Sequence, residues 1–424
     1  MKKITIALLV VGLTALLSSL ALAQPRPFTI IRVPNSSPDV PTAINDAGQV
    51  VVNHGTSNVF SISLWNRVGG AESLDVTGSD SIGVAINAEN DVAGVGANSS
   101  GYSEAFLWEP TAGTQWLGTL GGPVSAATGV NAGLDVVGMA YTAADLQHAF
   151  LWSQTGGMQD LTPSLTSLGG ALATGINTSG EVVGYYYPNG AANVVGFTWT
   201  QGSGLQNFGA PGTMALAVND GGTIVGQALT STGYRHAFSM TPAGVMTDLG
   251  TLGGDMSTAL GISNNGWIVG TSLTNNKSGV LRGFLWTPSG GMQDLAVVST
   301  LGTGQQPYSL QVNDYGDIAV TTRQELKILV PTMTATAVSS PNPSVAGKAV
   351  TFTITLSSIA GPPPDGEIVQ CTTLGIKGSG KLKNGVAKCS LSGIKAGTWK
   401  VLMNYGGDAY YLPATCSVSQ VVNP

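Results

Sequence analysis

The chain has 424 residues, of which only 9% are charged, and its 23 acidic residues outnumber 17 basic ones. This sparse charge excludes a nucleic-acid-binding protein, which needs clustered Lys and Arg, and disfavours a helical fold built on Glu, Lys and Arg. The hydrophobic content of 43% supports a core, so the chain is not disordered. The length allows two domains.

The first 23 residues are predicted to be an export signal. Lys2 and Lys3 precede an apolar stretch, and Ala21-Leu22-Ala23 forms a small-x-small cleavage site before Gln24. No later stretch is apolar over the ~18 residues that a membrane span needs. We therefore expect cleavage between Ala23 and Gln24. The product would be secreted, cell-surface or periplasmic, with no membrane span.

A motif recurs seven times within residues 24–330. Each copy has an Ile-Asn or Val-Asn pair, a short turn and a Val-Val-Gly-like run, as in Ile176-Asn177 followed by Val182-Val183-Gly184. An Asn in such a turn can hydrogen-bond its own backbone, and a Gly can adopt positive φ. The Asn slot is occupied by Asn45, Asn87, Asn131, Asn177, Asn219, Ser263 and Asn313.

Two further signatures alternate with this motif, typified by Ala149-Phe150-Leu151-Trp152 and Met158-Gln159-Asp160-Leu161. Each unit thus holds four apolar runs of strand length, and four strands per ~45 residues are typical of β-propeller blades. One strand, Phe28 to Val33, precedes the first copy and is predicted to complete the seventh blade. We therefore predict a seven-bladed β-propeller at 24–330. An open β-solenoid is the alternative.

These motifs resemble the probable extracellular repeat of the HAF family, named for the sequence His-Ala-Phe. That sequence appears as His148-Ala149-Phe150 and His236-Ala237-Phe238, and the Met-Gln-Asp-Leu and Thr-Leu-Gly-Gly segments match as well. The resemblance covers about Pro41 to Val330. It implies an exported bacterial repeat protein, and it implies no particular reaction or ligand.

Residues 331–424 are predicted to form a second domain. The repeats stop there, and the tail carries 7 Lys, no Arg and 3 acidic residues in a chain that is acidic as a whole. About seven strand-like runs indicate a β-sandwich. Segments beginning at Ser340-Pro341 and Tyr405-Gly406 resemble the opening and closing of bacterial immunoglobulin-like repeat domains, which implies a spacer, stalk or adhesion module. The expected fold is all-β throughout.

All three cysteines, Cys371, Cys389 and Cys416, lie in this tail. Export permits one disulfide and leaves one thiol, and three pairings are possible. We favour Cys371–Cys389, and three buried thiols are the alternative. Zinc is not expected at these cysteines, because the tail has no histidine, and no metal ligand is assigned anywhere in the chain. Calcium is an alternative, because the Asn-Asp-x-Gly turns share features with calcium loops, although their acidic spacing is incomplete.

No catalytic residue is assigned. His148 and His236 occupy the same repeat slot in different blades, so they are not expected to converge on one Ser-His-Asp site. Asp160, Asp248 and Asp294 also fall on repeat positions and are interpreted as structural.

The loops between the second and third strands of the blades vary in length and carry tyrosines. Variable loops on a rigid scaffold commonly carry recognition, and tyrosine suits binding to sugars or proteins. Ordinary loop packing is the alternative. The candidate ligand-binding residues are Tyr102, Tyr141, Tyr185, Tyr186, Tyr234 and Arg235.

The predicted function is an exported, non-enzymatic binding or adhesion module that recognises an extracellular glycan or protein through these loops. The immunoglobulin-like domain would serve as a spacer. Two alternatives remain open at this point. One is a hydrolase or lyase acting on extracellular polysaccharide, and the other is a structural component of the extracellular matrix.

Overall fold

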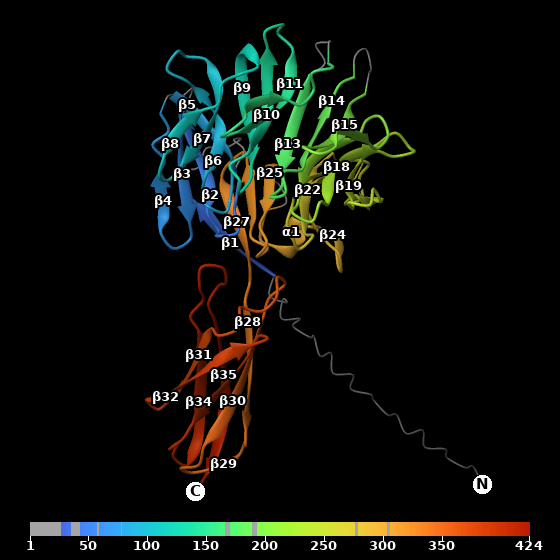
Figure 1. The fold of residues 1–424 in the computed structure, drawn as a ribbon. Coiled ribbons are helices and arrows are strands. Elements are labelled where there is room, and N and C mark those ends of the chain that lie inside the picture. Colours follow the sequence, from blue (N-terminus) through green and yellow to red (C-terminus); the bar gives the residue numbers. More distant parts are fainter. Residues whose placement is uncertain are drawn as a thin grey trace, which may run out of the picture.

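The chain forms two all-β units that lie end to end, a ring of seven blades and a smaller sandwich (Figure 1). This arrangement, seen in a computed structural model, confirms the predicted fold class. The predicted cleavage site between Ala23 and Gln24 lies outside the described residues. The structure describes residues 27–34, 43–56, 59–77, 79–165, 170–188, 193–275, 279–302 and 306–424.

Each blade is an antiparallel sheet whose strands run in order from the axis outward. Blades 1 and 2 contain β2 (Val50–Thr56), β3 (Val59–Asn66), β4 (Gly70–Ser73), β5 (Ser79–Ile86), β6 (Val92–Ala97), β7 (Ser103–Glu109) and β8 (Gly113–Trp116). Blades 3 and 4 contain β9 (Gly121–Val130), β10 (Val136–Thr142), β11 (Gln147–Ser153), β12 (Gly157–Asp160), β13 (Ala171–Ile176), β14 (Val182–Tyr186), β15 (Val195–Thr200) and β16 (Gly204–Phe208).

Blades 5 and 6 contain β17 (Met214–Val218), β18 (Ile224–Leu229), β19 (Arg235–Met240), β20 (Met246–Gly250), β21 (Ser257–Ile262), β22 (Ile268–Leu273), β23 (Leu281–Thr287) and β24 (Gly291–Asp294), followed by helix α1 (Leu295–Val298). Blade 7 contains β25 (Pro307–Val312), β26 (Ile318–Thr322), β27 (Leu326–Pro331) and β1 (Phe28–Val33). In blade 1 the innermost position is an isolated bridge between Ile44 and Val50.

The Phe-Leu-Trp strand is apolar on both faces because each blade packs against two neighbours. Phe150 and Trp152 of blade 3 share a buried cluster with Leu107 of blade 2. On its other face, Leu151 packs against the cluster that contains Phe197 of blade 4. Each fully buried side chain of this kind contributes roughly 1.5–3 kcal/mol. The same arrangement around the ring explains why the third strand carries Phe-x-Trp in blades 2, 3, 4 and 6.

The glycine of the Val-Val-Gly run is required by close packing. A Cβ atom on Gly138 would collide with the carbonyl oxygen of Ala126 and approach the ring of Phe150. The innermost strand has a β-bulge here, where the register shifts between Val137 and Gly138. The same collision with the innermost strand recurs at Gly94, Gly184, Gly226 and Gly270. Glycine is therefore a property of the bulged sheet.

Strand β1 closes the ring by pairing antiparallel with β27, from Phe28 opposite Pro331 to Val33 opposite Leu326. The strand order of blade 7 is β1-β27-β26-β25, so the N-terminal strand is outermost and lies beside a strand 300 residues away (Figure 1). Phe28 and Val33 are both buried. The predicted closure is therefore confirmed, and the open solenoid is wrong because the two ends of the array are joined.

The second unit contains β28 (Thr334–Ser340), β29 (Ser344–Val345), β30 (Val350–Ser357), β31 (Ile368–Thr373), β32 (Ile376–Lys383), β33 (Val386–Leu391), β34 (Gly397–Tyr405) and β35 (Ala414–Asn423). Its strands enclose one core that includes Phe352, Val401 and Tyr405. Within the described ranges, no helix is long and apolar enough to cross a bilayer.

The structure places the Cys371–Cys389 disulfide between β31 and β33, with the two Cα atoms 6.5 Å apart. Cys416 is a half-buried free cysteine on β35. We expect thiol titration of the denatured, non-reduced protein to find one thiol, and three after reduction. Replacing Cys371 by Ala should destabilise the sandwich by roughly 3 kcal/mol, because the bridge restricts the unfolded chain. Three thiols without reductant would contradict the pairing.

Candidate functional site

The Asn of each repeat lies at the end of the innermost strand and organises its own turn. In blade 3, the Oδ1 of Asn131 accepts hydrogen bonds from the N–H groups of Gly133 and Asp135, both at 2.9 Å. The fourth residue of the turn, counted from the Asn, has positive φ. It is Gly180 in blade 4, whereas in blade 3 a non-glycine residue, Leu134, adopts this conformation. Both predicted features of the turn, the side-chain bond and the positive φ, are thus confirmed.

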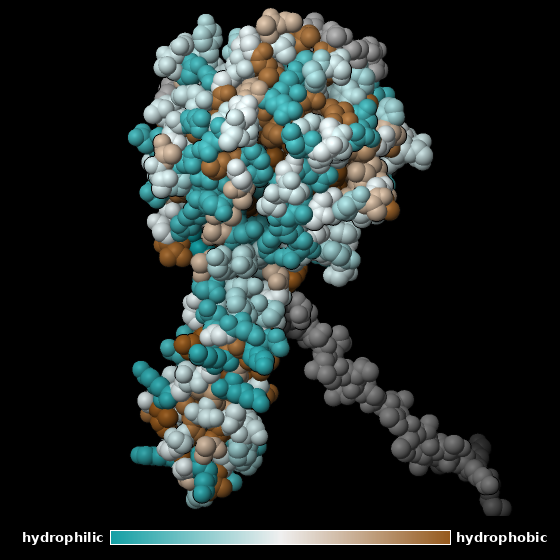
Figure 2. Space-filling model, viewed as in Figure 1, coloured by the Kyte–Doolittle hydropathy of each residue, from teal (hydrophilic) through white to brown (hydrophobic). Residues whose placement is uncertain are grey.

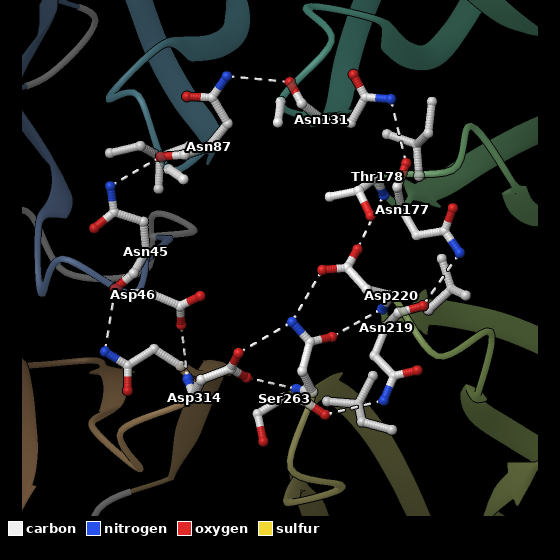
Figure 3. Close-up of a pocket in the computed structure, with 18 of the residues that line it drawn as sticks. Asn45, Asp46, Asn87, Asn131, Asn177, Thr178, Asn219, Asp220, Ser263 and Asp314 are labelled. Carbon is white, nitrogen blue, oxygen red and sulfur yellow. Dashed lines mark hydrogen bonds between the residues drawn. The ribbon is translucent and has the colours of Figure 1, made fainter. Parts of the chain in front are cut away.

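The amide nitrogen of the same Asn joins each blade to the next around the axis (Figure 3). Asn131 Nδ2 donates to the carbonyl oxygen of Asn177 at 3.2 Å. Equivalent bonds run from Asn45 to Asn87, Asn87 to Asn131, Asn177 to Asn219, Asn219 to Ser263 and Asn313 to Asn45. We call these six bonds the asparagine ring. Its single interruption is Ser263, whose side chain has no amide.

The asparagine ring surrounds an axial pocket of about 220 Å³. Its wall is formed by one Ile or Val from each blade, such as Ile44 and Ile176. Its rim is formed by the residue that follows each Asn or Ser, and it is acidic on one side only. The rim residues are Asp46, Ala88, Ala132, Thr178, Asp220, Asn264 and Asp314.

The acidic side of the rim is held together by its own hydrogen bonds. The N–H of Asp220 donates to Asn264 Oδ1 at 2.8 Å, and the N–H of Asp314 donates to Asp46 Oδ1 at 2.7 Å. Asn264 Nδ2 bridges one carboxylate oxygen of Asp220 and one of Asp314, each at 3.0 Å. Burial and then the neighbouring charges of Asp314 and Asp220 raise the pKa of Asp46, although the N–H of Asp314 opposes this.

These bonds indicate a structural role for the axial pocket. The rim carboxylates accept backbone N–H groups of adjacent blades, and the ring amides are used between blades. Within the part of the chain that the structure describes, no group of three or more His, Cys, Asp or Glu side chains is placed to hold a metal ion.

The turn of blade 7 contains a buried carboxyl whose ionisation opposes folding. Burial raises the pKa of Asp317 to about 7, although Arg67 and the hydrogen bond from Asn313 lower it. Because the unfolded carboxyl titrates near pH 4, the folded state holds one extra proton between pH 4 and 7. This group's contribution to stability should therefore fall as the pH rises through that window, by up to a few kcal/mol.

The measurement is denaturant unfolding from pH 4 to 8 for the wild type and Asp317→Asn, which cannot ionise. The difference between the two proteins isolates this carboxyl from all other titrating groups. We expect the wild type to lose stability relative to the variant as the pH rises. A constant difference across the range would contradict the raised pKa.

A separate groove of about 570 Å³ opens between blades 2 and 3 on the opposite face, where the loops after the second strands lie. Tyr102 is the large exposed aromatic residue of its lining, and 59% of its surface is accessible. Glu104 forms part of the wall, with its Oε2 accepting from Asn98 Nδ2 at 2.5 Å and its Oε1 from the Gly118 N–H at 2.7 Å. Thr119, Pro123, Thr142 and Asp145 complete most of the remaining lining.

The predicted tyrosines lie in the loops after the second strands or near the ends of those strands, but the structure does not bring them together. Tyr102 and Tyr234 are exposed, and they belong to blades 2 and 5, which are three blades apart in the ring. Tyr141 and Tyr185 are half-buried. Burial, with a contribution from Tyr187, raises the pKa of Tyr185.

The remaining two predicted residues make contacts within the protein. The ring of Tyr186 packs against Phe197 with centroids 6.4 Å apart, and its hydroxyl donates to Asn207 at 3.2 Å. Arg235 donates to the carbonyl of Gly212 at 2.9 Å. Sequence reasoning missed Glu104 and Asn98. The available signal was that Glu104 breaks the repeat by occupying the slot of His148 and His236.

The histidines of the His-Ala-Phe motif pair with the aspartates of the Met-x-Asp-Leu motif in their own blades. His148 Nδ1 lies 2.7 Å from Asp160 Oδ2, and His236 Nδ1 lies 2.9 Å from Asp248 Oδ2. In blade 6 the equivalent pair is Arg282 with Asp294 at 2.6 Å. Each pair links the third and fourth strands of one blade, and the three pairs lie in three different blades. They explain why the two motifs occur together, and they agree with the structural role expected for the aspartates.

Comparison with known proteins identifies one part of the chain. Residues 336–423 match the family of bacterial Ig-like domains, group 3. This supports the immunoglobulin-like assignment of the sandwich. The match does not extend to the propeller, and the HAF resemblance is not confirmed by it. No curated protein sequence matches the chain.

Solved structures with a similar fold include the streptogramin B lyase structure, at 15% identity and a TM-score of 0.49, covering 72% of this chain and 98% of that one. A gluconolactonase from Xanthomonas campestris has 10% identity, a TM-score of 0.39 and coverage of 72% and 91%. The acylaminoacyl peptidase from Pyrococcus horikoshii has 10% identity, a TM-score of 0.46 and coverage of 77% and 58%. At these levels no substrate or reaction transfers to this chain.

Proposed function

We propose that this chain is an exported, non-enzymatic binding module for an extracellular glycan, with the groove between blades 2 and 3 as its principal site. The carrying observation is Tyr102, an exposed aromatic ring beside hydrogen-bonding side chains in a groove of about 570 Å³. Ligand pockets of about 300–1,000 Å³ with a few polar groups are typical small-ligand sites. An aromatic face packs against the C–H face of a sugar, while Asn98 and Thr119 can hydrogen-bond hydroxyl groups.

The size and charge of the groove favour a glycan over a protein partner. A stable protein interface buries about 800 Å² on each partner, which is far more than one groove with a single aromatic residue offers. Glu104 and Asp145 make the lining acidic. We therefore expect neutral or amino sugars to be preferred over glycans that carry carboxylates or sulfates.

The contacts of Glu104 favour binding over hydrolysis. A glycosidase needs one carboxylic acid that donates a proton and a second carboxylate across the scissile bond. Both oxygens of Glu104 accept hydrogen bonds from donors of the protein. The carboxylate is therefore held in the groove wall by contacts within blade 2, and this favours a structural role over an acid that faces a scissile bond. The proposal also includes export by the predicted signal peptide and membership of the HAF-type extracellular repeats. The Ig-like domain would serve as a spacer. The disulfide and the match to bacterial Ig-like domains support an extracellular or periplasmic setting.

The test is glycan-array binding by the full mature chain, followed by titration of the best ligand against variants. Tyr102→Ala should weaken binding by roughly 1–3 kcal/mol, because it removes the aromatic contact. Stability should change by less than about 0.5 kcal/mol, because Tyr102 is exposed.

Tyr234→Ala is the matched control, since it removes an exposed tyrosine from the same loop position three blades away. A short oligosaccharide bound in the groove should be insensitive to it. Equal losses in both variants, or a loss of stability in Tyr102→Ala, would count against the groove. Release of reducing sugar from any bound glycan would favour the enzymatic alternative.

A further inference from the structure

The Ig-like domain touches the ring through the loop that follows β34, residues 406–413, which we call the docking loop. Tyr410 of this loop stacks on Tyr315 of blade 7, with ring centroids 4.3 Å apart. Arg67 Nη2 of blade 1 donates to the carbonyl oxygen of Asp408 at 3.4 Å. The contact lies at one end of the sandwich, and Figure 2 shows the two units meeting at a narrow waist. The outer sheet faces of the sandwich therefore stay open to solvent.

One of these faces is formed by four strands in the order β32, β31, β34 and β35. Side chains alternate along each strand, so that Cys371 of β31 is buried whereas Gln370 is exposed. The pairing fixes which outward residues are neighbours, because Gln370 lies opposite both Ser379 of β32 and Asn404 of β34. We call the outward surface of these strands the basic face. Its exposed polar residues include Gln370, Lys377, Ser379, Lys381, Lys400 and Asn404.

The four strands place positive charge on the basic face and no carboxylate. Its three cations are Lys377, Lys381 and Lys400, and none of them forms an ion pair within the described part of the chain. None of the four strands contains Asp or Glu. The chain as a whole has a net charge of −6, so this concentration of unpaired lysines is local. A surface of this kind attracts anionic partners.

The spacing of these lysines indicates a long partner. Lys377 and Lys381 are four residues apart on β32, which places their Cα atoms ~13 Å apart. Lys400 belongs to β34, which lies two strands away from β32, at ~10 Å. One small anion cannot reach all three ammonium groups, whereas a charged polymer that crosses the strands can contact each of them.

A pocket of about 380 Å³ adds hydrogen-bonding groups at the end of the basic face nearest the docking loop. Gln370 and Asn404 line it from adjacent strands, and each side-chain amide can both donate and accept hydrogen bonds. Ile368 lines the same pocket and is 53% exposed. Glu367, in the loop before β31, is the acidic residue of the lining. Amides beside an apolar side chain suit the hydroxyl and C–H groups of a sugar.

We propose that the basic face binds a polyanionic polysaccharide. The lysines contact the acidic groups of the polymer, and Gln370 and Asn404 contact its hydroxyl groups. Lysine is a mobile point charge rather than a planar fork, so the face recognises the spacing of charges more than one kind of acid. The outward residues of these strands include no aromatic ring on which a nucleic-acid base could stack, and their amides favour sugar hydroxyls over a membrane surface. This site is separate from the groove at Tyr102, whose acidic lining disfavours such a ligand.

The experiment uses the protein from Gln24 onward and isothermal titration with polygalacturonate. The control ligand is the same polymer with its carboxylates methyl-esterified, which keeps the backbone and removes the charge. Polygalacturonate should bind roughly tenfold or more tightly than the ester. Its affinity should fall roughly tenfold when the salt is raised from about 50 mM to about 500 mM, because salt screens exposed charges. Tyr102→Ala should leave this binding unchanged, which separates failure of this site from failure of the groove.

Two triple variants test the location. Replacing the three lysines of the basic face together should weaken binding roughly tenfold or more, since each exposed charge contributes a factor of about two to five. These changes are Lys377→Gln, Lys381→Gln and Lys400→Gln. The control removes the same charge from three exposed lysines outside the four strands, and it should bind within about twofold of the wild type. Its changes are Lys348→Gln, Lys388→Gln and Lys395→Gln.

A single variant should act in the opposite direction. Glu367→Gln removes the carboxylate at the pocket and keeps the shape of the side chain. It should tighten the binding of polygalacturonate about two- to fivefold, because it removes a charge that repels the polymer. Damage to folding cannot produce such a gain.

The proposal is overturned if polygalacturonate does not bind, if the methyl ester binds as tightly, or if the two triple variants lose the same affinity. Tighter binding to phosphatidylglycerol vesicles or to double-stranded DNA than to polygalacturonate would also overturn it, because the partner would then not be a polysaccharide.

Discussion

Starting the chain after residue 34, so that β1 is removed, is expected to abolish the cooperative folding of the ring. Strand β1 closes blade 7 through its whole length, from Phe28 opposite Pro331 to Val33 opposite Leu326. Phe28 and Val33 are 3% and 4% exposed, so their burial alone accounts for roughly 3–6 kcal/mol. That is a large part of the ~5–15 kcal/mol by which a typical domain is stable.

The truncation also exposes a strand edge. Without β1, the outer edge of β27 would present unpaired backbone N–H and C=O groups, and the side chains of Ile328 and Leu329 beside them are apolar. Such an exposed edge is a template for aggregation. We expect aggregates in size-exclusion chromatography and an early, broad unfolding transition.

The control is Arg32→Ala, which removes an exposed side chain from the same strand and leaves its pairing intact. Its ion pair with Glu325 is 3.6 Å long, and exposed pairs contribute about 0–1 kcal/mol. Arg32→Ala should therefore unfold almost as the wild type does. A truncated chain that unfolds like the full protein would show that β1 does not close the ring.

Breaking the asparagine ring should have the second-largest effect. Asn131→Ala leaves the N–H groups of Gly133 and Asp135 without their partner, and it removes one of the two hydrogen bonds to the carbonyl of Asn177, which keeps the N–H of Gly180. Each buried polar group left unsatisfied costs about 1–3 kcal/mol. We therefore expect a loss of about 3 kcal/mol or more, measured as a lower denaturant midpoint.

Blade 6 supplies matched controls for this prediction. Asn131→Ser reproduces in blade 3 the residue that blade 6 uses at Ser263, so it should be milder than Asn131→Ala. Ser263→Ala removes only a 3.3 Å bond from the Trp267 N–H, and it should cost about 1 kcal/mol. If Asn131→Ala and Ser263→Ala lose the same stability, the bonds between blades contribute nothing.

Much of the fold follows from local pattern in this sequence. The spacing of Phe150 and Trp152 marks a strand that is buried on both faces, and its repetition predicts blades. Asn177 and Gly180 specify a turn whose side-chain bond and positive φ are both found. The separate strand from Phe28 to Val33 predicts closure, because the seventh repeat lacks a fourth strand, and β1 occupies that place.

The candidate sites depend on contacts that local pattern does not encode. Nothing in the composition around Asn131 indicates that its amide nitrogen reaches Asn177, because that distance is set by how two rigid blades pack. Tyr102 and Tyr186 occupy similar loop positions in the sequence, yet one side chain is exposed and the other packs against Phe197. Tyr102 lies in the loop before β7, whereas Tyr186 is the last residue of β14 and its ring packs against β15.

The sequence by itself therefore determined the elements, their repetition and the closure of the ring, since each depends on residues within one blade or on one strand in excess. Only the tertiary structure decided where polar groups are satisfied and which side chains share a surface. Lys377 and Lys400 belong to strands that do not pair with each other, and they share a face because β31 pairs with both β32 and β34. Such surfaces arise from the order of strands in a sheet, and no periodicity in the sequence records that order.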